Sequence, residues 1–497
     1  MKDRKKQFSI LLALLFVLAG TLSACSAGEG NMYDMAEGGI VLDANRESYT
    51  EIIENPFIST AEQTASYFSI DANTSSYPNL RSLIRNNYEI PKDAVRVEEM
   101  LNYFRYDYTT PQDGSVLSMT ASVFDTPYNE NTKLLTIGLA AQEVAFQETK
   151  NNLVFLIDTS GSMFGADRLG LVQSAFMMLA ENLNPEDRVS IVTYAGSDRV
   201  ALEGAYGYET QKIVAVIEDL AASGSTAGSK GIETAYRLAE QYFIEGGNNR
   251  VILATDGDFN VGISNTEQLK AFIAQKRDSG VYLSVFGVGR DNLQSDKMEA
   301  LALNGNGTCS YIDSRMEARK ALVEQIGGSL ITVAKDVKAG VIFNPEYVES
   351  FRLIGYENKQ MSQEEFENSA TDAGELGSGH KVTVVYEIKL KDTDAAVVPS
   401  DKLAQVTVKY KSPDATAEDA SQELLMDITW EAFHAEMTQQ EAFVASVVEF
   451  ALLLRDSQYK QDASLESLVA RLDSLDLSED AFKEEFRSLV KEYAGKE

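Results

Sequence analysis

The chain has 497 residues and a net charge of −32, with 76 acidic and 44 basic side chains. Nucleic-acid-binding proteins need a basic surface, so this charge balance argues against DNA or RNA as a partner. Solubility outside the cell is the simplest meaning of the charge. Two histidines and two cysteines exclude zinc sites of the usual His/Cys kind. The length allows two or three domains with cores of their own.

The amino terminus has the pattern of a secretory signal with a lipobox. Four basic residues among the first six precede an apolar stretch at residues 8–18, which is too short to span a bilayer, and Leu22-Ser23-Ala24-Cys25 follows. This segment resembles bacterial lipoprotein precursors, in which the cysteine becomes the lipidated first residue. We therefore expect residues 1–24 to be removed and Cys25 to anchor the protein, on the extracytoplasmic side, to the cell membrane or another membrane of the cell envelope. A lone cysteine after an ordinary cleaved signal is the alternative.

Loss of the signal would make the mature chain more acidic. Residues 1–24 carry four basic and one acidic side chain, so their removal changes the net charge from −32 to −35. Such a chain stays away from anionic lipid head groups except through its anchor. With Cys25 acylated, Cys309 has no disulfide partner, and stability must come from the core. Residues 25–64 are polar and weakly periodic, which predicts a flexible tether.

Residues 65–149 are predicted to form a small α+β unit. Alternating or continuous apolar residues indicate strands at 68–71, 119–124 and 133–139. Apolar residues at helical spacing indicate helices at 77–85 and 95–104.

Residues 150–334 alternate between strands and helices, and this alternation predicts the fold class. Near-continuous apolar runs at 154–158, 189–194, 251–255, 281–287 and 310–313 are separated by helical stretches at 169–183, 211–220, 231–243, 266–277 and 315–330. This pattern predicts a mainly parallel sheet covered on both faces, that is, a doubly wound α/β domain. Ligands of such sheets bind beyond the carboxyl ends of the strands.

Residues 335–497 are predicted to be a β-rich and helical domain. Strand patterns occur at 337–343, 351–354, 381–390 and 403–410, and the chain turns helical from about residue 432. Phe443, Val447, Phe450, Ala451 and Leu454 form an apolar stripe at helical spacing, which we interpret as core rather than as a groove for a partner.

Polar oxygen groups follow two of the predicted strands of the α/β domain. Asp158-Thr159-Ser160-Gly161-Ser162 comes after one strand, Asp256 comes after another, and Thr226 lies in a Gly/Ser-rich loop before a helix. Taken alone, the first segment is a common capped turn. The combined set, with three hydroxyls and two carboxylates, suits Mg²⁺ or Mn²⁺, since Mg²⁺ prefers oxygen ligands and retains several waters.

This set resembles the metal-ion-dependent adhesion site of von Willebrand factor type A (VWA) domains. The resemblance implies that Ser160 and Ser162 bind the metal directly and that Thr226 switches between direct and distant positions. It also implies that Asp158 and Asp256 act directly or through water. A partner's Asp or Glu would then complete the coordination. Residues 68–71, 91–104, 334–337, 343–345, 352–358 and 372–375 further resemble the flanking regions of a bacterial family of VWA-domain lipoproteins.

Two functions compete at this stage. The first is a lipid-anchored binding module of the cell envelope that captures an acidic residue of a protein or peptide through Mg²⁺. The second is a metal-dependent hydrolase, because an Asp-x-Ser segment at a strand end also resembles aspartyl-phosphatase sites. Those sites need a second Asp two residues after the first, and Ser160 stands there. His380 and His434 both lie outside the α/β domain, so we predict a binding protein rather than an enzyme.

Overall fold

The computed structural model describes residues 49–496 except 113, 225–229, 258–264, 290–293, 393–397 and 417. Cys25, Thr226, the predicted signal peptide and most of the predicted tether therefore lie outside the described residues. None of the helices in the described part is long and apolar enough to cross a membrane.

The predicted α/β domain contains a six-stranded sheet with the strand order β10-β9-β8-β5-β6-β7. Neighbouring strands run parallel except at β7, which pairs antiparallel with β6 and forms one edge. The mainly parallel, doubly wound sheet is thus confirmed, and β7 is a strand that the sequence analysis did not predict. The strands are β5 (Asn151–Asp158), β6 (Arg188–Tyr194), β7 (Asp198–Tyr206), β8 (Asn248–Thr255), β9 (Val281–Val288) and β10 (Cys309–Ile312).

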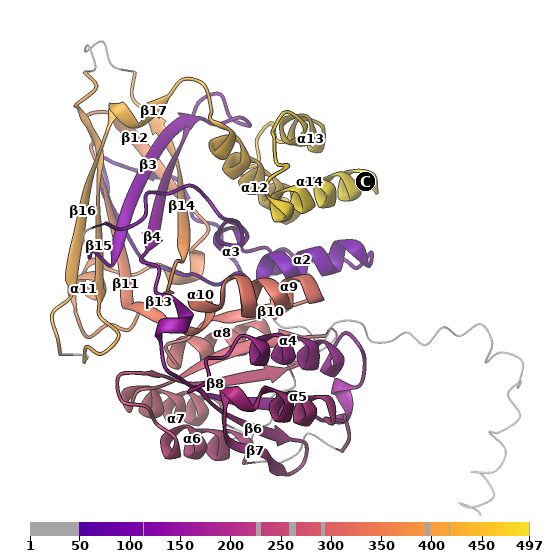
Figure 1. Cartoon of the computed structure of the whole chain (residues 1–497). Coiled ribbons are helices and arrows are strands. Elements are labelled where there is room, and N and C mark those ends of the chain that lie inside the picture. Colours follow the sequence, from indigo (N-terminus) through magenta and orange to yellow (C-terminus); the bar gives the residue numbers. More distant parts are fainter. Residues whose placement is uncertain are drawn as a thin grey trace, which may run out of the picture. The chain divides into compact units, whose positions relative to one another are not determined.

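Helices cover both faces of this sheet (Figure 1). On one face, Phe155 and Ile157 of β5 share a core with α4 (Leu169–Glu181) and α5 (Thr210–Glu218). On the other face, the alternate β5 residues Val154 and Leu156 share a core with α6, α7 and α8. Burial on both sides explains why the central strands are apolar at every position. The three helices of the second face are α6 (Gly231–Gln241), α7 (Thr266–Asp278) and α8 (Ser295–Asn304).

The segments before and after the α/β domain share their sheets. One sheet has the order β1-β12-β14-β4-β3-β17, and the other has the order β13-β11-β15-β16, with β2 paired to β11. Because β4 pairs with β14 and β2 with β11, the segments 65–149 and 335–497 are interleaved rather than separate units. Their strands are β1 (Ile58–Ser59), β2 (Ala65–Ser69), β3 (Leu117–Asp125), β4 (Lys133–Ala141), β11 (Thr332–Phe343), β12 (Val348–Ile354), β13 (Gly374–Gly377), β14 (Lys381–Leu390), β15 (Lys402–Lys411), β16 (Gln422–Thr429) and β17 (Phe433–His434).

A helical layer packs on the first of these two sheets (Figure 1). The predicted apolar stripe of α12 is buried there, with Phe443, Val447 and Phe450 at most 1% exposed, so its interpretation as core is confirmed. Thr438 caps α12 with a reciprocal bond to Glu441, which explains why the helix begins there. The helices of this layer are α2 (Ser76–Arg85), α3 (Val97–Asn102), α12 (Gln439–Arg455), α13 (Leu465–Asp473) and α14 (Ala481–Ala494). Helix α11 (Gln363–Glu367) packs instead against β2 and β11 of the other sheet.

The last helical stretch of the α/β domain departs from its prediction. Residues 315–330 form α9 (Arg315–Arg319), a π-helical turn (Lys320–Glu324) and α10 (Ile326–Leu330) rather than one regular helix. The π turn brings Lys320 into a buried position, where its Nζ donates a hydrogen bond of 2.6 Å to the carbonyl of Tyr103. Burial lowers the pKa of Lys320 to about 7.

A buried ionic cluster lies beside this turn. Arg81 of α2 donates hydrogen bonds of 2.8 and 2.6 Å to the carboxylate of Asp313 and one of 2.9 Å to Glu317. Since Arg81 is fully buried and both acids are nearly so, removal of one partner would leave a buried charge uncompensated. The carboxyl-terminal end of the α/β domain is thereby fixed to α2.

Candidate metal site

Asp158 is the last residue of strand β5, and its side chain is fully buried. Its Oδ1 accepts a hydrogen bond of 2.8 Å from the backbone N–H of Ser160. Its Oδ2 is also buried and has no well-formed hydrogen bond among the described residues, although the hydroxyl of Tyr194 lies near enough to favour the charged carboxylate. A buried carboxylate oxygen without a well-formed hydrogen bond is costly, so this position favours a ligand or ion against it.

The two serines of the same loop lie beside each other. The hydroxyls of Ser160 and Ser162 are 2.9 Å apart, and Ser160 is fully buried. The loop turns through a short 3₁₀ helix, Gly161–Met163, and the hydroxyl of Ser160 interacts with the carboxylate of Asp158. The loop thus gathers two neutral oxygens and one carboxylate at the end of β5.

Asp256 follows β8, the strand next to β5 in the sheet, and its side chain is fully buried. The carboxyl ends of both parallel strands meet at the same edge, so Asp256 lies near Asp158 as the sequence analysis predicted. Burial, with a smaller contribution from the negative charge of Asp256, raises the pKa of Asp158 to about 7, against the opposing effect of hydrogen bonds from Ser160 and Tyr194. The two carboxylates therefore repel one another, and a bound cation would relieve this repulsion.

Four of the five predicted metal ligands thus come together, and Thr226 lies outside the described residues. The described segment nevertheless reaches close to Thr226 in sequence, because the N–H of Gly161 donates to the carbonyl of Gly224 at 3.1 Å. In the described part of the chain, no three His, Cys, Asp or Glu side chains cluster in a way that could hold a metal. Hydroxyls must therefore supply part of any coordination here, and the set present suits a hard cation such as Mg²⁺ or Mn²⁺.

Two residues beside the site were missed by the sequence analysis. Arg168 donates a hydrogen bond of 2.6 Å to the carbonyl of Ser162 and lies 3.7 Å from Asp256 Oδ2. The sequence feature that could have revealed Arg168 is its place at the start of a predicted helix, where the helix dipole disfavours positive charge. Phe164 follows the serine loop and is 82% exposed. Its signal was a large aromatic residue within a Gly/Ser-rich loop.

A groove of about 710 Å³ adjoins the site. Thr159 and Gly224 line it beside the candidate ligands, and Val216 and Leu220 of the α5 region form apolar parts of its wall. Arg199 and Lys212 line it too, together with the acidic Asp219. Lys212 pairs with Glu209, whereas Arg199 is exposed and forms no ion pair with any described residue.

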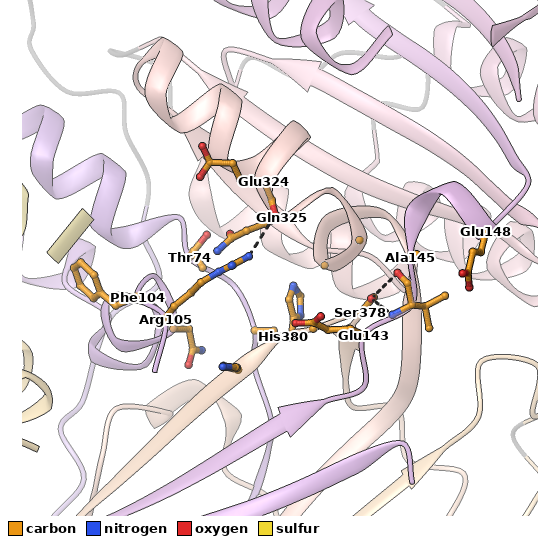
Figure 2. A pocket seen from close by; sticks show the side chains of 17 residues that line it. Thr74, Phe104, Arg105, Glu143, Ala145, Glu148, Glu324, Gln325, Ser378 and His380 are labelled. Atoms are coloured by element: carbon orange, nitrogen blue, oxygen red, sulfur yellow. Dashed lines mark hydrogen bonds between the residues drawn. The ribbon is translucent and has the colours of Figure 1, made fainter. Parts of the chain in front are cut away.

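A second cavity, of about 550 Å³, lies between the α/β domain and the flanking sheets. Figure 2 shows His380 in it, with Arg105 on one side and Ser378 on the other. The backbone N–H of Gly377 donates to Nδ1 of His380, and burial lowers the pKa of this histidine to about 4. The Ser378 hydroxyl donates to the carbonyl of Val144 and accepts its N–H, so it is engaged with the backbone. This arrangement is structural rather than that of a nucleophile and its base.

Family models match three consecutive parts of the chain. A model described as von Willebrand factor matches residues 43–136, and the von Willebrand factor type A domain matches residues 152–325. A model described as "Uncharacterized protein YfbK, C-terminal" matches residues 328–495.

Individual proteins and one solved structure are similar to parts of this chain. The uncharacterized protein YfbK of Escherichia coli is 38% identical over 442 residues, which cover 84% of this chain and 76% of that protein. The uncharacterized protein sll0103 of Synechocystis is 31% identical over 170 residues, which cover 34% of this chain and 39% of that protein. A solved structure of von Willebrand factor type A from Catenulispora acidiphila aligns with a TM-score of 0.40 and 16% identity, over 78% of this chain and 91% of that one. The chain therefore belongs to the family of bacterial VWA-domain proteins that includes YfbK and carries the YfbK carboxyl-terminal domain.

Proposed function

We propose that this protein is a lipid-anchored binding protein of the cell envelope that uses a divalent cation to capture an acidic residue of a protein or peptide. Asp158, Ser160, Ser162, Thr226 and Asp256 would hold Mg²⁺ or Mn²⁺. Cys25 would carry the lipid. The partner would be a protein or peptide with an exposed Asp or Glu, and nucleic acid is not expected to bind.

The observation that carries this proposal is the donor set at the ends of β5 and β8. Asp158 presents a buried oxygen without a well-formed hydrogen bond, Ser160 contacts this carboxylate, and the hydroxyls of Ser160 and Ser162 lie 2.9 Å apart. When bound, the cation supplies an electron-poor centre that attracts a carboxylate. The role of the chain is to hold that centre with hydroxyls, which leave more of its charge uncompensated than carboxylates would.

The surface around the site supports a macromolecular partner. Phe164 exposes its ring to solvent next to the serine loop, where a partner could bury it. The adjoining groove offers room for a chain segment, and Arg199 supplies a positive charge there although the whole protein is strongly acidic. An extended segment with an acidic residue at the cation and further acidic residues along the groove fits this surface.

Binding is favoured over catalysis by the residues that accompany Asp158. The position two residues after Asp158 holds Ser160, where an aspartyl phosphatase needs a second acid. His380 accepts a backbone hydrogen bond in the second cavity, and His434 pairs with Glu441 at 2.6 Å. Neither histidine belongs to the α/β domain that carries the site, so we propose no enzymatic activity.

Calorimetry of Mg²⁺ binding to the full chain tests the proposal. We expect one Mg²⁺ per chain and a loss of affinity of at least about 100-fold in Asp158→Ala/Ser160→Ala, the upper end of what loss of outer-shell partners costs. Asp219→Ala/Ser223→Ala removes the same two residue types from the groove wall and should bind as the wild type does. Unchanged binding in the first variant would disprove the site assignment.

A further inference from the structure

Arg168 lies between the serine loop and Asp256, and it is held from three sides. Its Nη1 donates to the carbonyl of Ser162 at 2.6 Å and lies 3.7 Å from Asp256 Oδ2. Its stem crosses Gly289, just after β9, where a Cβ would lie 2.8 Å from both Cγ and Nε of Arg168. Only a residue without a Cβ leaves room for the arginine to take this path.

This place is electrostatically unusual for an arginine. Arg168 directly precedes α4, a helix of 13 residues, and the amino-terminal end of a helix carries a partial positive charge that repels cations. The negative charge of Asp256, 3.7 Å away, compensates for that repulsion. The interaction is little screened by water, because the Arg168 side chain is 17% exposed and that of Asp256 is fully buried. The charge of Asp256 is thus already engaged by a cation that belongs to the chain.

We propose that Arg168 is a positioning residue of the metal site, which shares the Asp256 carboxylate with the bound cation and so keeps that cation weakly neutralised for a partner's acidic residue. This inference rests on the proposed function. It adds a regulator of affinity that the five predicted ligands do not contain. In physical terms, Arg168 lowers the affinity for the metal while it raises the attraction for a carboxylate at the same place.

Substitution of Arg168 separates a charge effect from a structural one. Arg168→Gln keeps a polar side chain with an N–H donor but removes the charge, so it no longer competes for Asp256. A unit charge a few ångströms from a divalent ion, even when screened as in bulk water, corresponds to at least about tenfold tighter Mg²⁺ binding in this variant. Arg168→Lys retains the charge and should bind Mg²⁺ within about twofold of the wild type.

The experiment is calorimetric titration of Mg²⁺, and separately of Mn²⁺, into the full-length wild type, Arg168→Gln and Arg168→Lys, with the melting temperature of each protein recorded. Tighter binding in Arg168→Gln alone supports the proposal. Equal or weaker binding in a folded Arg168→Gln overturns it, because a purely structural arginine would give that result. If Arg168→Gln folds only with saturating Mg²⁺, the metal replaces the missing charge and the proposal holds; if it stays unfolded with Mg²⁺, the proposal fails. Absence of binding in the wild type would overturn the proposed function itself.

Discussion

The backbone N–H of Gly161 donates a hydrogen bond of 3.1 Å to the carbonyl of Gly224, and this bond joins the serine loop to the segment that precedes Thr226. The N–H of Ser223 adds a second link, at 2.8 Å, to the carbonyl of Thr159. Two backbone bonds thus connect the loop that carries Ser160 and Ser162 to the chain just before the fifth predicted ligand. A change at Thr226 is therefore a direct test of the predicted ligand set.

Thr226→Ala should weaken partner capture, because it removes one hydroxyl of the predicted ligand set together with a methyl group. Thr226→Ser, which retains the hydroxyl, is the matched control and should capture as the wild type does. The measurement is a crosslinked pull-down from intact envelopes in Mg²⁺ and in EDTA, with circular dichroism of each protein. Equal capture by the folded wild type and Thr226→Ala in both media would show that recognition lies in the flanking regions.

Phe164→Ala should weaken capture of the same partner while changing the free energy of unfolding by less than about 0.5 kcal/mol, as expected for an exposed position. Tyr208→Ala is the control, because Tyr208 is also exposed but follows the end of β7 that pairs with the start of β6. That end of the sheet is opposite to the metal site. If both variants capture the partner equally well, Phe164 is not part of the interface.

Cys25→Ala should release the protein from the membrane fraction, since Leu22-Ser23-Ala24 is the segment expected to direct lipid attachment to Cys25. Metabolic labelling with an alkyne fatty acid, followed by fractionation, measures both lipid and location. Cys309→Ala is the control and should keep the label. Label that persists in Cys25→Ala would place the lipid elsewhere.

Lys320→Met should remove a pH-dependent part of the stability. The folded-state pKa of Lys320 is about 7, below its ordinary value of 10.5, so the unfolded chain binds more protons between these two values. The contribution of this lysine to the free energy of unfolding therefore rises with pH between these two values, by up to about 1.4 kcal/mol per pH unit. Denaturant unfolding at several pH values should show that, from pH 7 upward, the free energy of unfolding of the wild type rises relative to that of Lys320→Met. Parallel pH profiles of the two proteins would contradict the lowered pKa.

Much of the α/β domain could be predicted because its strands are short apolar runs and its helices are amphipathic. The edge strand β7 was missed because Arg199, Glu203 and Gly204 interrupt its apolar pattern, as is common at sheet edges. The break in the helix predicted at 315–330 was missed because burial of Lys320 is a tertiary effect. The sequence of residues 315–330 by itself has the pattern of an ordinary helix.

The pairing of the flanking strands could not be predicted from local pattern. Strands β4 and β14 are separated by the whole α/β domain, and an apolar alternation identifies a strand without identifying its neighbour. For the site, the order of the motifs predicted Asp158, Ser160, Ser162 and Asp256 at adjacent strand ends. Arg168 was missed because its contact with Asp256 depends on the path of its side chain across Gly289.

The most direct measurement is a crystal structure of the full-length protein grown with Mn²⁺, with anomalous diffraction recorded to locate the ion. We expect one anomalous peak at the ends of β5 and β8, from an ion about 2.2 Å from the hydroxyls of Ser160 and Ser162, near the distance typical of hard divalent cations. A fully occupied peak elsewhere, or no peak at these hydroxyls at saturating Mn²⁺, would contradict it.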